Sequence, residues 1–244
     1  MILDSLLIFV VTLLAGMSVK LFKEVKSSHL NVFLVFTGAY LFSITFTHIL
    51  PPLFSSAESH FNAGLLVLIG FFFQLILEYF TSGVEHGHMH EHHHDHGGFR
   101  TGSLLIALSI HAFMEGSILV FPAVGHDHDS IPLLLGILLH KIPAAIALMS
   151  YLVCTKKPSR YTWLLLVLFS LATPAGLILS DFIYNAGLLD TDIFMSLMAL
   201  VGGAFLYIST IILFESSPGH TQNLRKLLFI ILGALSALLI EFVV

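Results

Sequence analysis

The sequence predicts an all-α membrane protein, a bundle of eight transmembrane helices, and three observations support this. Hydrophobic residues make up 57% of the 244-residue chain and charged residues only 10%, far from the composition of soluble domains. Eight apolar segments approach or exceed the roughly 18–20 residues that a helix needs to cross a bilayer. The basic residues are concentrated in alternate connections, which is typical of a chain that crosses a membrane repeatedly.

Short connections join the eight spans, so we expect one transmembrane domain over 1–244. In chain order the spans are 2–22, 32–50, 61–81, 102–122, 131–154, 161–180, 193–214 and 224–244. The first begins MILDSLL, with Asp4 where a signal peptide has basic residues, so we expect it to stay in the membrane. Cys154 is the single cysteine, which excludes an internal disulfide.

The distribution of basic residues predicts the orientation. Nine of the ten lie beside the first, third, fifth and seventh connections: Lys20, Lys23, Lys26, Arg100, Lys156, Lys157, Arg160, Arg225 and Lys226. Cytoplasmic connections are rich in Lys and Arg, so these four connections are predicted to be cytoplasmic and both termini to lie outside. We expect a multi-pass protein of the cell membrane (plasma or inner), with lipid and no nucleic acid as partners.

An internal repeat relates the second and seventh spans. Residues 38–42, Gly-Ala-Tyr-Leu-Phe, match residues 203–207, Gly-Ala-Phe-Leu-Tyr, and a threonine follows at Thr45 and at Thr210. The two spans are predicted to run in opposite directions, so the copies are inverted. Inverted repeats on either side of a midplane site are typical of transporters that alternate access between the two sides.

Polar residues at the middle of the fourth and fifth spans predict the principal site. His111 lies about 16 Å into its span and His140 about 14 Å into the next, at 1.5 Å per residue. Consecutive spans are antiparallel, so both histidines reach the midplane of a bilayer core about 30 Å thick. Glu115 follows His111 by one helical turn and shares its face. Two imidazoles and a carboxylate at one depth predict a transition-metal site.

Lys141, beside His140, predicts that the site holds one metal ion. Its ammonium repels a second cation and can pair with Glu115 when the site is empty. Pro143 removes the hydrogen bond to the Leu139 carbonyl, and Pro174 does the same in the sixth span. Both prolines permit kinks that can move during gating.

Other polar residues are weaker candidates. Four lie near span ends and could line an ion pathway: His48, Glu78, Asp181 and Glu215. The connection 82–100 contains EHGHMHEHHHDHGG and is predicted to be a disordered cytoplasmic loop. Its histidines are candidates for weak metal binding, and they are His86, His88, His90, His92, His93, His94 and His96.

The three central ligands alone leave the activity open. Three protein ligands leave a position for water, which fits ion transport and zinc-dependent hydrolysis equally. The ligands also cannot distinguish import from efflux. The absence of an HExxH motif argues against an intramembrane hydrolase. A receptor or metal sensor would need a partner-binding domain, for which the short connections leave little room.

The chain resembles the ZIP (Zrt/Irt-like) family of divalent metal transporters over essentially its whole length. HAFMEG at 111–116 and HKIP at 140–143 carry the resemblance, together with THILP, GGAFLY, GFFFQLILE and the histidine-rich loop. Many members have Asn, Glu, His and Glu at the positions of Ala112, Lys141, Ala144 and Ala145. This chain is more similar to the animal-type branch with HxxxEG and HK.

The resemblance implies a zinc importer, with Fe²⁺, Mn²⁺ and Cd²⁺ as lesser substrates. His111, Glu115 and His140 would be the transport ligands, and Lys141 would occupy the place of a second metal. Thr173 stands where the two-metal branch has a further acid. Zinc would then be the cargo rather than a cofactor, the protein would not be an enzyme, and a homodimer is expected.

Overall fold

The computed structural model describes residues 1–21, 27–55, 62–81, 99–120, 131–155, 159–188, 190–215 and 224–243, and within them it contains helices and no strands. The helices are α1 Ile2–Leu21, α2 Ser27–Ile44, the π-helix η1 Thr45–Ile49, α3 Leu50–Ser55, α4 Ala63–Thr81, α5 Phe99–Ser117, α6 Ile131–Cys154, α7 Ser159–Asn185, α8 Thr191–Glu215 and α9 Leu224–Val243. In the part of the chain so described, eight helical segments are long and apolar enough to cross a membrane. The prediction of an eight-helix membrane bundle is therefore confirmed.

The ends of two spans differ from the sequence prediction. The second span was expected to end at residue 50, before Pro51 and Pro52, but it continues through η1 into α3. Both prolines lie in α3 directly after η1, so the helix continues although neither proline can donate a hydrogen bond to the preceding turn. The sixth span was expected over 161–180, whereas α7 contains 27 residues. A helix of that length is about 40 Å long, so it must tilt or project beyond the hydrocarbon.

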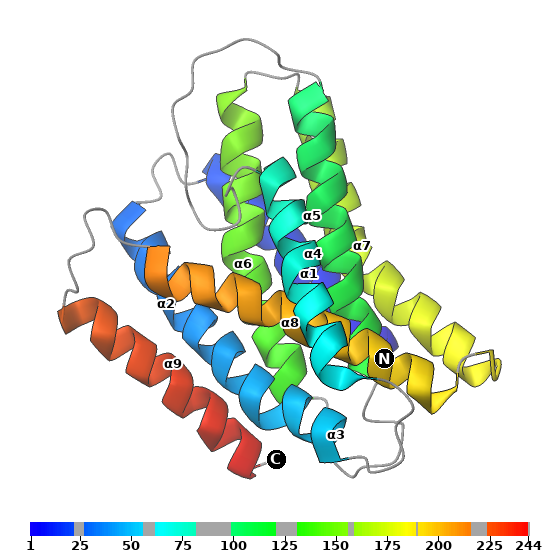
Figure 1. Cartoon of the computed structure of the whole chain (residues 1–244). Helices are drawn as coiled ribbons and strands as arrows, with labels where there is room; N and C mark the ends of the chain where they lie inside the picture. The colour runs from blue at the N-terminus through cyan, green and yellow to red at the C-terminus, as the bar shows by residue number, and fades with distance from the viewer. Residues whose placement is uncertain are drawn as a thin grey trace.

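The helices form two groups (Figure 1). In the first group, α5 packs along α7, and α1 packs on both α6 and α7. In the second group, α4 packs on α8, and α2 packs on both α9 and α8. The main contacts between the groups are α2 with α6 and α4 with α5. Both termini lie in the lower half of Figure 1, as expected after an even number of crossings.

Paired glycines allow the closest helix crossings within each group. In the first group, a Cβ atom added at Gly116 would overlap the Thr173 carbonyl, and one added at Gly176 would overlap the Phe113 carbonyl. The second group has the same arrangement, with Gly70 against Leu200 and Gly203 against Val67. Small residues let backbones approach closely in membranes, where helices gain little from hydrophobic burial against lipid.

The two copies of the repeat pack against each other in opposite directions. Gly38 in α2 lies against Ile212 in α8, whereas Ile49, further along the second span, lies against Gly202. The second span and α8 therefore pack antiparallel to each other. This geometry agrees with the inverted repeat that the sequence predicts.

The outer faces of the bundle are strongly apolar. Large hydrophobic side chains are exposed on the helices with the least internal packing, for example Leu14 on α1, Phe72 on α4 and Leu239 on α9. Surfaces of this kind are unfavourable in water and match the acyl chains of a bilayer. The buried polar residues, in contrast, face the interior of the bundle.

We predict that Gly203→Val destabilises the protein, because its side chain would collide with the α4 backbone. Overpacking of this kind costs about 1–3 kcal/mol of unfolding free energy. Thermal unfolding in detergent should therefore occur at a clearly lower temperature. Gly102→Val is the matched control, because no atom lies within 4 Å of the added Cβ. Equal melting temperatures for the two variants would contradict the proposed role of the α4–α8 crossing.

Candidate metal centre

Four buried polar side chains meet between α5 and α6. His111 and Glu115 project from the same face of α5, one turn apart, and His140 and Lys141 are neighbours on α6. All four residues are at most 3% exposed. His111 lies near the middle of the apolar span Thr101–Val120, and His140 near the middle of the span Ile131–Cys154.

The ligand atoms of His111, Glu115 and His140 lie within 4.8 Å of one another. The Oε1 atom of Glu115 is 3.0 Å from Nε2 of His111 and 3.9 Å from Nε2 of His140. The two imidazole rings are nearly perpendicular, with their centroids 5.9 Å apart. Tetrahedral ligands about 2.0–2.1 Å from zinc are roughly 3.3–3.4 Å from each other. Small movements of these side chains would therefore be enough to hold a zinc ion.

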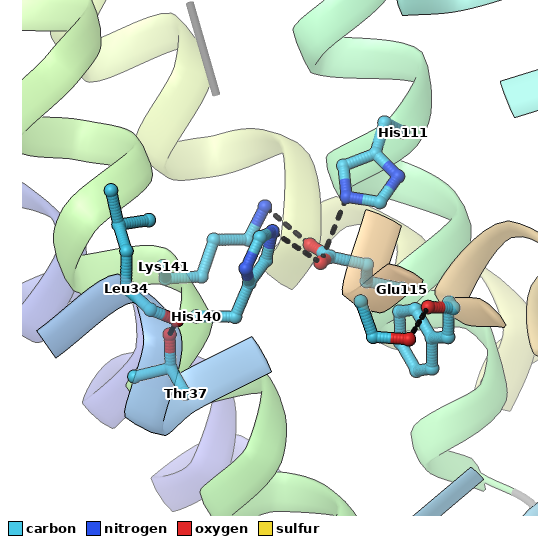
Figure 2. Close-up of polar contacts among 8 residues, drawn as sticks. Leu34, Thr37, His111, Glu115, His140 and Lys141 are labelled. Atoms are coloured by element: carbon cyan, nitrogen blue, oxygen red, sulfur yellow. Dashed lines mark hydrogen bonds and ion pairs between the residues drawn. The ribbon is translucent and has the colours of Figure 1, made fainter. Parts of the chain in front are cut away.

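Lys141 binds the other oxygen of the same carboxylate. Its Nζ atom is 2.5 Å from Oε2 of Glu115 and lies 4.8 Å from the centre of the Phe169 ring on α7. Figure 2 shows both histidines and the lysine converging on Glu115. Glu115 thus presents one oxygen to the imidazoles and the other to a fixed ammonium, and the aromatic face adds a favourable cation–π contact.

The helix crossing between α5 and α7 determines where Glu115 lies. Gly116, the next residue, lies directly against the Thr173 backbone, so the backbone at Glu115 cannot move closer to α7. Pro143 lies inside α6 and Pro174 inside α7. Neither proline has an N–H group, so the carbonyls of Leu139 and Ser170 lose their usual helical donors.

The other candidates from the sequence lie apart from this centre. His48, in η1, is 3.0 Å through Nδ1 from Oε1 of Glu241 on α9. Glu78 is half-buried near the end of α4, and Asp181 accepts a hydrogen bond of 2.7 Å from Asn185. Glu215 is the last residue of α8. The seven histidines of the loop lie outside the described residues.

The sequence did not predict three features of the centre and of the candidates around it: the ring beside Lys141, the unpartnered hydroxyl of Thr173 and the partner of His48. Phe169 beneath Lys141 is one of 22 phenylalanines, and its role depends on how α7 crosses α6. Thr173 has a buried hydroxyl for which the structure gives no hydrogen-bond partner. Glu241 pairs with His48, and the only signal for this in the sequence is a carboxylate near the end of an apolar span.

Comparison with known proteins places this arrangement in a family. The sequence profile described as ZIP zinc transporter matches residues 85–241. Protein zntD of Dictyostelium discoideum is 31% identical over 163 residues, which cover 62% of this chain and 24% of that protein. Zinc transporter ZIP1 of Takifugu rubripes is 27% identical over 150 residues, which cover 60% of this chain and 48% of that protein.

The region that matches the family profile, residues 85–241, includes both helices that carry the centre, α5 and α6, and the histidine-rich segment before them. The chain spans about half or less of the length of these two relatives. Since the family profile nevertheless covers more than half of the chain, the protein belongs to the ZIP zinc transporter family.

Proposed function

We propose that this protein carries Zn²⁺ across the membrane into the cytoplasm through a site formed by His111, Glu115 and His140. The observation that supports this most strongly is the convergence of these three buried groups within 4.8 Å, in the middle of two apolar helices. Buried ionisable groups in a membrane are costly and are usually functional. The similarity to zinc transporter ZIP1 of Takifugu rubripes supports this chemistry.

The donor set suits zinc and its neighbours among the divalent metals. Two imidazole nitrogens and one carboxylate oxygen are typical zinc ligands, and they leave a fourth position for water. An incompletely coordinated ion can leave more easily than one in a closed cage. Such a site does not exclude similar ions, so Fe²⁺, Mn²⁺ and Cd²⁺ are proposed as lesser substrates.

The proposed site is mononuclear because Lys141 supplies a fixed positive charge next to it. The ammonium is held by Glu115 and lies over Phe169, where a second divalent ion would meet electrostatic repulsion. Pro143 and Pro174 are proposed as points where α6 and α7 bend during gating. His48, Glu78, Asp181 and Glu215 are proposed as positions along the pathway.

The proposed topology has both termini outside and the histidine-rich loop, within 82–100, in the cytoplasm. The basic ends of the helices support it: Lys20 lies in the last turn of α1, and Arg225 and Lys226 lie in the first turn of α9. Zinc leaving the centre would then meet the loop histidines, which are suited to weak binding. We place the protein in the cell membrane as one transmembrane domain, surrounded by lipid and forming a homodimer. Transport involves no enzymatic step, and zinc is its cargo and not a cofactor.

We predict that His111→Ala reduces zinc flux by about tenfold or more. Mutation of a residue that only hydrogen-bonds to a metal ligand typically lowers metal affinity or activity by about 10–100-fold, and the loss of a ligand itself should cost at least as much. Uptake of radioactive zinc into proteoliposomes measures this. Ser209→Ala is a suitable control, since that buried hydroxyl donates hydrogen bonds to backbone carbonyls of its own helix, α8. A deletion of residues 86–96 should retain flux.

The direction of the flux decides between import and efflux. Inward flux from the side of the termini, lost in His111→Ala, supports the proposal. Flux only in the opposite direction would replace it with metal efflux. Equal flux in wild type and His111→Ala would exclude the central site as the route.

We predict that Lys141→Glu increases the zinc bound per chain from one ion to two, because a carboxylate replaces the repelling ammonium. Metal analysis of the purified protein after dialysis gives this ratio. The loop histidines would add zinc, so the measurement requires protein without residues 86–96. Lys141→Gln, which removes the charge without adding a ligand, should still bind one ion. If Lys141→Glu also bound one, Lys141 would not occupy a second metal's place.

A further inference from the structure

Tyr40 lies at the main contact between the two helix groups. It projects from α2 towards α6 and is completely buried. Its hydroxyl donates a hydrogen bond of 2.9 Å to the carbonyl of Pro132. Its ring lies over Gly136, where an added Cβ would be only 3.2 Å from a ring carbon. Both contacts join helices of different groups.

The residues that Tyr40 contacts on α6 lie on the same face of that helix as His140, one of the residues of the metal centre. Pro132, Gly136 and His140 follow each other at intervals of four residues, so they share one face of the helix. Each interval is about 6 Å along the axis. Tyr40 therefore covers the face of α6 that leads from the beginning of the helix to the ligand His140.

The inverted repeat supplies a counterpart for comparison. Tyr40 corresponds to Phe205 in α8, because residues 38–42 match residues 203–207. We infer that the inverted repeat that relates α2 to α8 also relates α6 to α5, the two helices that carry the centre. On α5, Ala107 lies four residues before the ligand His111, just as Gly136 lies four residues before His140. By the repeat, the contact between Tyr40 and Gly136 would correspond to a contact between Phe205 and Ala107.

The two counterpart contacts differ in the structure. Helix α2 packs along α6, whereas over the described residues α8 has no comparable contact with α5. Phe205 also has no hydroxyl group, so it could not form the bond that Tyr40 forms with Pro132. Tyr40 therefore adds a helix contact and a hydrogen bond on the side of the centre at which α6 begins, and over the described residues Phe205 makes no corresponding hydrogen bond to α5, although Phe205 and Ala107 are also buried.

We propose that Tyr40 is a positioning residue that keeps the centre closed on the side where α6 begins, and that its bond to Pro132 must break before His140 can be reached from there. This inference rests on the proposed transport function. The bond stabilises one arrangement of the two groups and has no equivalent in the opposite arrangement. Tyr40 thereby sets the equilibrium between the two arrangements.

The test measures the accessibility of cysteines on both sides of the centre. In a Cys154→Ser background, Leu133→Cys reports on the α2–α6 contact, and Ala107→Cys reports on the opposite side. Both residues are almost fully buried. A membrane-impermeant thiol reagent is applied to each side of sealed proteoliposomes in turn, with and without Tyr40→Phe.

Tyr40→Phe should increase the labelling rate at residue 133 by about two- to tenfold, the range expected for loss of one hydrogen bond. Labelling at residue 107 should fall, because a shift between two arrangements opens one side and closes the other. A merely loosened structure would raise both rates and overturn the proposal. Unchanged rates at both positions would also overturn it.

Two further variants separate the possible outcomes. Gly136→Ala pushes against the ring while leaving the hydroxyl, so it should act in the same direction if Tyr40→Phe does not fold. Tyr207→Phe removes a tyrosine hydroxyl from α8 and should leave both rates unchanged. Labelling needs no zinc transport. A protein that labels as expected but carries no zinc would refute the proposed function and retain the role of Tyr40.

Discussion

The ion pair between Glu115 and Lys141 is the interaction on which the metal centre depends. A carboxylate in the middle of a membrane is strongly unfavourable unless a nearby charge or metal compensates it. Lys141 provides that charge at 2.5 Å, while the second carboxylate oxygen remains directed at His111 and His140. The pair thus allows a ligand set to persist in apolar surroundings without a bound ion. It also explains why two adjacent charged groups occur in a chain with so few of them.

Close backbone packing gives this pair a rigid support. Gly116 and Gly176 bring α5 and α7 together beside Glu115, and Gly70 and Gly203 do the same for α4 and α8. Each helix group therefore behaves as a packed unit. The contact of α2 with α6 is different, because a large side chain, Tyr40, replaces backbone-to-backbone approach there. Interfaces built from a few side chains rearrange more easily than glycine crossings.

Much of the fold and the convergence of His111, Glu115 and His140 could be predicted from the sequence, because they depend on local patterns. Hydropathy located the eight spans, and helical spacing placed Glu115 one turn from His111. Depth along antiparallel spans brought His140 to the same level. Contacts between distant helices could not be predicted in this way: the Tyr40–Pro132 bond, the Phe169 ring beneath Lys141 and the His48–Glu241 pair all depend on crossing angles. The length of α7 also escaped prediction, since Asp181 resembled the end of a span.

The ion pair between Lys141 and Glu115 has a consequence for the energetics of the proposed ion movement. Without a bound ion, the two opposite charges of this pair cancel. In the proposed transport, a zinc ion would add two positive charges to the centre. A membrane potential does work of about 2.3 kcal/mol per charge per 100 mV. We therefore infer that a membrane potential that is negative on the cytoplasmic side accelerates the inward movement of zinc. The movement of the centre without zinc would not respond to this potential. This inference predicts an electrical current that requires zinc. A current from the protein in the absence of zinc would contradict the inference.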